Sequence, residues 1–451
     1  MTSRLMQGVT FKVVGIAVLA LLMLIPLAQV NGLIGERRAR AGEAAEQIAR
    51  RWGGAQIVGG PVLVVPVLRV RMQADGAARV EEREYLLPDR LAVSATLAPE
   101  TRRYGLYEST VYRAEVKIEG RFSSVDVAAL AALGGEPQWQ RAELRVPVAD
   151  VRGIRRVSAL RFDGRELAFG PAAGGVAAIA AIAAPLAIGR ELADAAAEAR
   201  SVPFAFELTL AGSERLAALP LARETDLHVE APWPDPGFDG AYLPASHRID
   251  ANGFAADWQV LDLNRRFGQR WNEQASDPAA VAESAFGVSL VRPANPYQQN
   301  VRAGKYGVLF IALTFVAFFL FEVLRGLRVH PVQYLLVGLA LCTFYVVLLA
   351  LSEQFGFGLA YAAAALATTA IVGGYAAAVL AQRRAGWALG ALLGLIYALL
   401  YGLVVSEDYA LLMGALALLL TVAALMYLTR RVDWYAMAAD GAGPPGVRRP
   451  A

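Results

Sequence analysis

The sequence predicts a membrane protein with one N-terminal transmembrane helix, then a large, mainly β, sandwich-like domain outside the cytoplasm, then a bundle of five transmembrane helices. Three observations predict this arrangement. Hydrophobic residues make up 56% of the 451-residue chain and charged residues only 18%, against about a quarter in ordinary soluble domains. The longest apolar runs lie at the start of the chain and in its C-terminal third. Between them, apolar and polar residues alternate with the period of two that is typical of half-buried strands.

Six windows reach the length of roughly 20 apolar residues that a helix needs to cross a bilayer. They are residues 13–30, 306–324, 334–351, 357–381, 387–405 and 409–428. The first window is longer than the apolar core of about 7–15 residues in a cleaved signal peptide, and no clear cleavage site follows it. We therefore expect an uncleaved signal anchor.

Basic residues in the short loops predict the orientation of the spans. Arginines follow the second, fourth and sixth spans, whereas the alternate loops are acidic and carry no lysine or arginine. Both termini are therefore expected in the cytoplasm. The expected domains are an anchor at residues 1–31, an external domain at 32–305, a five-helix domain at 306–428 and a cytoplasmic tail at 429–451.

The external domain begins with a charged, alanine-rich stretch, residues 33–52, which has the composition of a stalk helix ending at Gly53-Gly54. Strand alternation follows, and Asp75-Gly76, Asp163-Gly164 and Asn252-Gly253 indicate hairpins between mainly antiparallel strands. Residues 174–189 are apolar but contain proline and are too short for a span, so we assign them to this domain.

No catalytic, metal-binding or cofactor-binding residues are predicted, and we expect a protein that is not an enzyme. The best acid–base cluster alternates along one strand, at Glu224, Asp226, His228 and Glu230. Such a row is typical of a solvated strand face, and a single imidazole makes a poor transition-metal site. The small net charge of +3 gives no support to a nucleic-acid partner.

Two features inside the predicted spans bear on function: a single carboxylate and a series of regularly spaced small residues. The only carboxylate within a span is Glu322, which we expect to be neutralised by Arg325 or by a neighbouring helix, so an ion-coupled pump is disfavoured. In the fifth span, Gly386, Gly390, Gly394 and Gly402 lie at multiples of four residues, a spacing that predicts a close helix–helix seam. The spacing does not distinguish a partner helix of the same chain, which we favour, from one of another chain.

Several short strings, in order along nearly the whole chain, resemble those of the CreD-like family of inner-membrane proteins. They are Trp52-Gly53 with Gln56, Gly212-Ser213, Trp233-Pro234 with Phe238, Arg302-x-x-Lys305-Tyr306-Gly307, His330-Pro331-x-Gln333-Tyr334 and Leu351-Ser352-Glu353. The resemblance implies a bacterial inner-membrane protein whose external domain is periplasmic. It also implies a role in envelope integrity and a place in a regulon under a sensor-kinase and response-regulator pair, but no reaction, cofactor or ligand.

Our first hypothesis is a non-enzymatic protein whose partners are the lipid bilayer and an envelope component: a protein, a lipid or a peptidoglycan-related ligand. The alternative is an uncoupled transporter or lipid-handling protein that uses the helix bundle. The candidate residues for partner contact or signalling lie in three places. They are Trp233 and Phe238 in an aromatic-proline loop, Arg302, Lys305 and Glu353 toward the outer surface, and Glu322, His330 and Gln333 at the inner turn.

Overall fold

The computed structural model describes residues 9–73, 76–123, 135–186, 201–273, 277–290, 296–325, 329–379, 383–406 and 409–430. The chain divides into two compact units, one comprising Met1–Arg40 with Ala294–Ala451 and the other Ala41–Pro293. Most of the expected cytoplasmic tail, residues 431–451, lies outside the described residues, as do Asp75 and Arg328.

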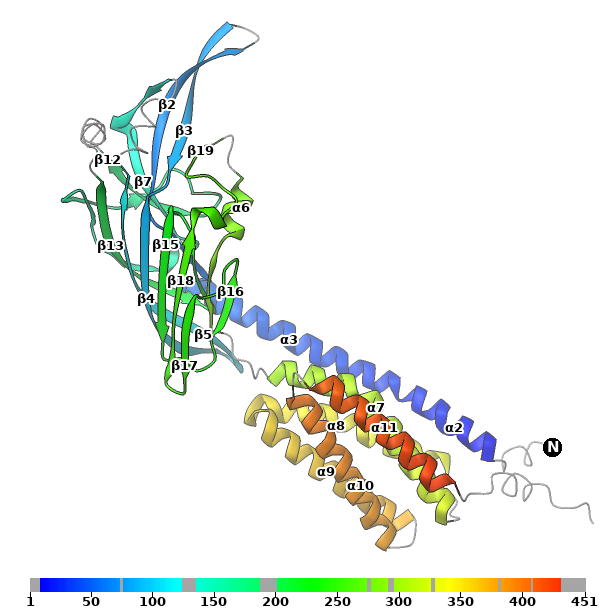
Figure 1. Cartoon of the computed structure of the whole chain (residues 1–451). Helices are drawn as coiled ribbons and strands as arrows, with labels where there is room; N and C mark the ends of the chain where they lie inside the picture. Colours follow the sequence, from blue (N-terminus) through cyan, green and yellow to red (C-terminus); the bar gives the residue numbers. More distant parts are fainter. Residues whose placement is uncertain are drawn as a thin grey trace, which may run out of the picture. The chain divides into compact units, whose positions relative to one another are not determined.

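Within the described residues, six helical segments are long and apolar enough to cross a membrane, one near the N-terminus and five near the C-terminus. The first combines α2 (Val9–Leu22) with α3 (Leu24–Trp52). The other five are α7 (Pro296–Arg325), α8 (Pro331–Phe355), α9 (Phe357–Val379), α10 (Arg383–Val405) and α11 (Ala410–Thr429) (Figure 1). The predicted arrangement of one span followed by five is confirmed.

Two of these helices extend well beyond their apolar windows. α7 begins at Pro296, so Arg302 and Lys305 lie on a transmembrane helix rather than in the loop before it. α3 runs without a break to Trp52, which confirms the stalk helix. The interruption between α2 and α3 falls at Met23, three residues before Pro26, whose missing N–H cannot bond to the carbonyl of Leu22.

The β strands form the second unit, and the described strands build three sheets. The largest has nine strands in the order β10-β9-β13-β5-β4-β15-β18-β17, with β8 also on β13. Their bounds are β4 Arg90–Tyr104, β5 Tyr107–Phe122, β8 Ile154–Val157, β9 Leu160–Phe162, β10 Arg165–Leu167, β13 Val202–Ser213, β15 Glu224–Ala231, β17 Ser246–Asp250 and β18 Gly253–Leu261.

The other two sheets have seven and four strands. The seven-stranded sheet contains β2 Val62–Gln73, β3 Gly76–Leu86, β6 Glu136–Pro137, β7 Ala142–Pro147, β11 Gly170–Pro171, β12 Ala181–Leu186 and β19 Arg270–Asn272. The four-stranded sheet contains β1 Gln56–Val58, β14 Arg215–Ala218, β16 Gly237–Gly240 and β20 Phe286–Ser289. Short helices are η1 Trp139–Arg141, η2 Val151–Gly153, η3 Asp262–Asn264 and α6 Pro278–Glu283.

One hydrophobic core joins the sheets face to face, as expected of a sandwich-like domain. It contains Val65 of the seven-stranded sheet, Val116 and Trp258 of the nine-stranded sheet, and Phe286 of the four-stranded sheet. The strand β12 lies within the predicted extramembrane segment 174–189, which confirms that this apolar stretch belongs to the β unit.

The pairing is mainly antiparallel, as predicted. The expected turn at Asp163-Gly164 is confirmed, whereas the turn between β17 and β18 is Ala251-Asn252, one residue before the expected Asn252-Gly253. Asp163 and Gly164 both have positive φ, 49° and 79°, between β9 and β10, as a type I′ turn requires. Two pairs are parallel, β4 with β15 and β1 with β14, and each joins strands from distant parts of the chain. Local turn signals do not reveal such pairs.

Candidate functional site

One polar cluster lies at the end of the bundle that we expect to face the cytoplasm, and we call it the inner polar cluster. It centres on Glu322 of α7, whose exposed fraction is 3%. Its carboxylate accepts hydrogen bonds from Tyr334 Oη at 2.9 Å and from the backbone N–H of Val329 at 2.8 Å. It also forms an ion pair with Lys12 Nζ of α2. The charge is therefore neutralised by a neighbouring helix, one of the two expected possibilities. The identity of that helix was not foreseen, although Lys12 is the only lysine beside the first apolar window.

His330 and Gln333 shape the start of α8 rather than binding the carboxylate of Glu322. The backbone N–H of His330 donates to Gln333 Oε1 at 2.9 Å, and the N–H of Val332 donates to His330 Nδ1 at 3.3 Å. Together these bonds form a capping box, and Pro331 occupies the first helical position. The inner turn is therefore held by local backbone bonds as well as by Glu322.

The outer polar cluster centres on Glu353, near the C-terminal end of α8. Its carboxylate accepts a 3.3 Å hydrogen bond from Tyr297 Oη of α7 and lies 4.0 Å from Arg37 Nη1 of α3. Next to it, Asn300 Nδ2 donates to Ser352 Oγ at 2.8 Å. The predicted outer residues Arg302 and Lys305 lie on α7, where Arg302 is half-buried and Lys305 is exposed.

Glycines of α7 and α8 let the N-terminal helix approach closely. A Cβ added to Gly307 would lie 2.8 Å from Leu27, and one added to Gly338 would lie 2.7 Å from Met23 Sδ. A Cβ at Gly304 would collide with Asn31 Oδ1. Sequence reasoning missed this seam because its glycines are not regularly spaced along one window.

The four glycines singled out in the fifth span, now α10, have different surroundings. A Cβ at Gly386 would clash with Ala377 of α9, and Gly390 lies near Gly373 of the same helix. Gly402 faces Met413 of α11, whose Cε would lie 3.1 Å from a Cβ added to the glycine. A Cβ at Gly394 would meet no atom of the described chain within 4 Å.

At its other end, α3 is fastened to the β unit through Trp52. The indole N–H donates to the carbonyl of Tyr112 at 3.2 Å, and the guanidinium groups of Arg102 and Arg155 lie 4.3 and 5.3 Å from the ring. Arg155 Nη2 also donates to the carbonyl of Trp52 at 2.7 Å, which caps the helix end. Gly53 follows with φ +148°, and a Cβ added there would lie 2.9 Å from the carbonyl carbon of Ala211.

Gln56 and Asp150 add further hydrogen bonds at this end of α3. Gln56 Nε2 donates to the carbonyls of Asp150 at 3.1 Å and Ala211 at 3.0 Å. Asp150 Oδ2 accepts from the N–H of Gly54 at 2.9 Å, and Asp150 Oδ1 accepts from Arg152 Nε at 2.9 Å. The hydrogen bonds from Arg152 and then Gly54 hold the pKa of Asp150 below its usual value. The Trp-Gly-x-x-Gln string thus forms a fixed connection between the stalk helix and the β unit.

The aromatic-proline loop is packed more closely than an exposed contact loop would be. Phe238 lies in β16, half-buried, with its ring 5.7 Å from that of Trp258 and 6.1 Å from that of Phe254. Trp233 is also half-buried and donates to the carbonyl of Asp235 at 3.1 Å. The exposed apolar residue of this loop is Leu243, with an exposed fraction of 77%.

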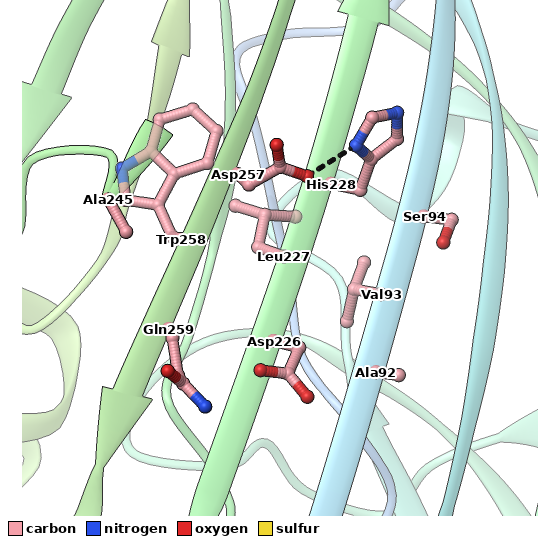
Figure 2. Close-up of a pocket in the computed structure, with 10 residues that line it drawn as sticks. All are labelled: Ala92, Val93, Ser94, Asp226, Leu227, His228, Ala245, Asp257, Trp258 and Gln259. Carbon is pink, nitrogen blue, oxygen red and sulfur yellow. Dashed lines mark hydrogen bonds and ion pairs between the residues drawn. The ribbon is translucent and has the colours of Figure 1, made fainter. Parts of the chain in front are cut away.

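The outer face of the nine-stranded sheet carries a shallow depression of about 340 Å³ (Figure 2). Its walls come from β4, β15 and β18. Here His228 Nδ1 lies 2.7 Å from Asp257 Oδ1, and Ser246 Oγ donates to Asp257 Oδ2 at 2.9 Å. The contact with His228, followed by that with Ser246, lowers the pKa of Asp257.

This row does not have the geometry of a nucleophile and its base, because Ser246 bonds to the carboxylate instead of the imidazole. Glu230 is exposed, whereas His228 is half-buried, like Glu224 and Asp226 of the same row. Among the described residues, no three His, Cys, Asp or Glu side chains are placed to hold a metal ion.

Comparison with known proteins places the chain in a family. The family model described as "Inner membrane protein CreD" matches residues 8–435. The protein of that name from Escherichia coli strain K12 is 33% identical over 427 residues, which are 93% of this chain and 92% of the relative.

Among solved structures, a zinc metallopeptidase of the M1 family from Deinococcus radiodurans matches 39% of this chain and 39% of its own, at 9% identity and a TM-score of 0.19. That likeness is too low to carry an argument about fold or activity. The family match, in contrast, extends over both the helices and the β unit. This chain belongs to the CreD family of inner-membrane proteins.

Proposed function

We propose that this protein is a non-enzymatic inner-membrane protein that supports the integrity of the cell envelope or its response to stress. In this proposal residues 32–305 lie in the periplasm and bind an envelope component, and both termini lie in the cytoplasm. The observation that carries the proposal is the N-terminal helix. A single helix, α3, belongs to the membrane unit at one end and is locked into the β unit at the other.

The contacts of this helix support a role in coupling. Its β-unit end is held by Trp52, whose indole, ring faces and carbonyl all have partners. Its membrane end contacts α7 and α8 through Leu27, Asn31 and Arg37. We propose that a state of the β unit reaches the outer polar cluster through α3, since a rigid secondary element can carry coupling between two sites.

We propose that the inner turn changes when the N-terminal helix moves. Glu322 joins α2, α7 and α8 at this turn, and the exposed side chain of His330 lies beside it. A shift of the N-terminal helix would change the Lys12–Glu322 pair and hence the turn. We propose that this turn either passes on the state of the periplasmic domain or binds a cytoplasmic partner.

Photocrosslinking in cells tests the binding proposal. A photoreactive residue at the exposed position Leu243 should trap an envelope protein, lipid or peptidoglycan-related species, whereas one at Val70, exposed on β2, serves as the matched control. Phe238→Ala and Trp233→Ala should reduce the Leu243 product if their packing positions this loop. Equal products at both positions in a protein of normal abundance would contradict specific binding by this loop.

Single substitutions test the inner turn. His330→Ala and Gln333→Ala should weaken an envelope-stress phenotype more than they reduce the amount of protein in the membrane. If phenotype and abundance fall in parallel, the turn serves only to hold the fold. A reporter fused within residues 32–305 tests the orientation, and activity only inside the cell would contradict it.

One observation favours the alternative, an uncoupled transporter or lipid-handling protein. The hydroxyl of Tyr345 is buried in the bundle core without a hydrogen-bond partner among the described residues, and that of Tyr397 is buried beside Thr368. Polar atoms at such depth are costly, so they call for a functional test. Transfer of a fluorescent lipid between leaflets of proteoliposomes, lost in Tyr345→Phe with Tyr397→Phe, would support this second function.

A further inference from the structure

A buried arginine lies in the turn that joins η3 to β19. Arg265 has an exposed fraction of 9%, whereas every other residue from Leu261 to Arg270 is at least partly exposed. Its Nη2 donates to Gln269 Oε1 at 2.5 Å. Within the described part of the chain, its Nε and Nη1 are buried and have no acceptor.

No carboxylate of the described residues forms an ion pair or a hydrogen bond with the guanidinium of Arg265. The nearest acidic group, Asp262, lies 3.4 Å from Arg223 Nη1 and forms its ion pair with that arginine. The ring of Phe267 lies 4.8 Å from the guanidinium carbon. Such a ring attracts the cation, but it is not an acceptor for N–H groups that lie in the guanidinium plane.

The guanidinium nevertheless keeps its charge. Burial, the largest effect, and the positive charge of Arg223 lower the pKa of Arg265 to about 10, while Asp262 opposes them. At neutral pH the side chain is therefore still protonated. A buried charge with one neutral acceptor is unfavourable, and arginine is almost never buried unless it is paired.

We infer that Arg265 is the centre of an anion-binding site whose ligand carries a carboxylate or phosphate group. The planar guanidinium with free N–H donors matches these oxyanions, and an arginine offers them stronger bonds than a neutral partner does.

The position of the site allows a ligand to enter. Asn264 and Arg266, the neighbours of Arg265 in sequence, are exposed, and Leu263 has an exposed fraction of 88%. Arg265 therefore lies directly beneath the surface turn. On the other side, Gln269 fixes the guanidinium, because its Nε2 donates to the carbonyls of Leu87 at 3.0 Å and Pro88 at 2.6 Å.

The identification of this anion with the envelope ligand rests on the proposed function, but anion binding itself does not. The test uses the full-length protein purified in detergent. Inorganic phosphate or acetate is titrated against chloride at constant ionic strength, and vesicles of phosphatidylglycerol are compared with vesicles of phosphatidylcholine. The readouts are the unfolding temperature and tryptophan fluorescence, since Trp271 contacts Phe267 edge-to-face at 5.9 Å.

We expect saturable binding of at least one of these anions by the wild-type protein and by the matched control Arg266→Gln. Affinity should fall roughly tenfold or more in Arg265→Gln, because charge-assisted hydrogen bonds are lost. Arg265→Lys, which keeps the charge but not the planar group, should also bind more weakly. A response to free phosphate or acetate indicates a soluble anion, and a response only to phosphatidylglycerol indicates a lipid headgroup.

The inference is overturned if the wild-type protein responds to none of these probes, or if Arg265→Gln binds as tightly as Arg266→Gln. The wild-type titration is decisive even if Arg265→Gln does not fold. If the crosslinking test fails but the protein still binds anions, the proposed function is contradicted and the anion-binding site is not.

Discussion

The two charged pairs that attach the N-terminal helix to the bundle differ in how completely their carboxylates are satisfied. At the inner end, the nearly buried Glu322 has an ion pair and two hydrogen bonds, of 2.9 and 2.8 Å. At the outer end, the side chain of Glu353 is 10% exposed and has one 3.3 Å hydrogen bond and an arginine at 4.0 Å.

This difference indicates which end of the helix can move. A buried carboxylate that loses a partner leaves an uncompensated charge, so the inner pair is expected to act as a fixed point. The outer pair is longer and its carboxylate has fewer hydrogen bonds, so we expect its contribution to stability to be small and its partners to exchange at little cost. If α3 transmits a displacement from the β unit, we expect the outer cluster to respond first.

The largest expected effect comes from Lys12→Met, which leaves Glu322 buried without its cation. We expect a loss of about 3 kcal/mol in the free energy of unfolding, the low end of the range for broken buried pairs because Lys12 is about a third exposed. Thermal unfolding in detergent and membrane abundance measure it. Lys305→Met, which removes an exposed lysine, is the control.

The charge-exchanged double variant Lys12→Glu with Glu322→Lys should recover part of this stability. If Lys12→Met costs no more than Lys305→Met, the inner pair is not a fixed point and the comparison fails.

The second largest effect on stability is expected at the glycine seam where the N-terminal helix packs against α7, between the two charged pairs. Gly307→Ala places a Cβ 2.8 Å from the buried Leu27 side chain and 3.3 Å from Tyr345, so either the Leu27 side chain or the N-terminal helix must shift. We expect a cost of about 2 kcal/mol, typical of overpacking. Gly394→Ala, whose Cβ meets no described atom within 4 Å, should be neutral or slightly stabilising. Equal unfolding temperatures for the two variants would show that the seam is not tight.

The sequence alone was sufficient to predict the arrangement of spans, the stalk helix and the mainly antiparallel β unit, because each depends on local periodicity or apolar length. It was not sufficient for contacts between distant segments. Nothing near Glu322 in sequence points to Lys12, and the parallel pairing of β4 with β15 depends on strands more than a hundred residues apart. Likewise, Arg265 looks like any surface arginine until its burial is known.

A smaller effect is expected at the β-unit end of the helix, where Asp150 holds the N–H of Gly54. Asp150→Asn should cost about 1 kcal/mol at pH 7, because a charge-assisted bond is replaced by a neutral one. The folded-state pKa of Asp150 is lowered, so its contribution is present above the unfolded value of about 3.9 and is lost as pH falls through the lower folded value.

The stability difference between wild type and Asp150→Asn should therefore shrink below about pH 4. Denaturant unfolding at a series of pH values measures it, with Asp250→Asn on the exposed strand β17 as control. A difference that stayed constant down to pH 2 would show that the carboxylate does not act through its charge.

The smallest effect on stability is expected at the outer pair itself. Arg37→Gln should change the free energy of unfolding by no more than about 0.5 kcal/mol, because the pair is long and its arginine is partly exposed, and added salt should reduce even this difference.

The effect of Arg37→Gln on motion should be larger than its effect on stability. Without the pair, we expect faster backbone hydrogen exchange in the middle of α3 and unchanged exchange at the inner turn. Arg40→Gln, which removes only an exposed pair with Glu36 on the same helix, is the matched control. A loss of stability as large as that of Lys12→Met would mean that both ends of the helix are fixed points. Displacement of α3 could then not begin at the outer cluster.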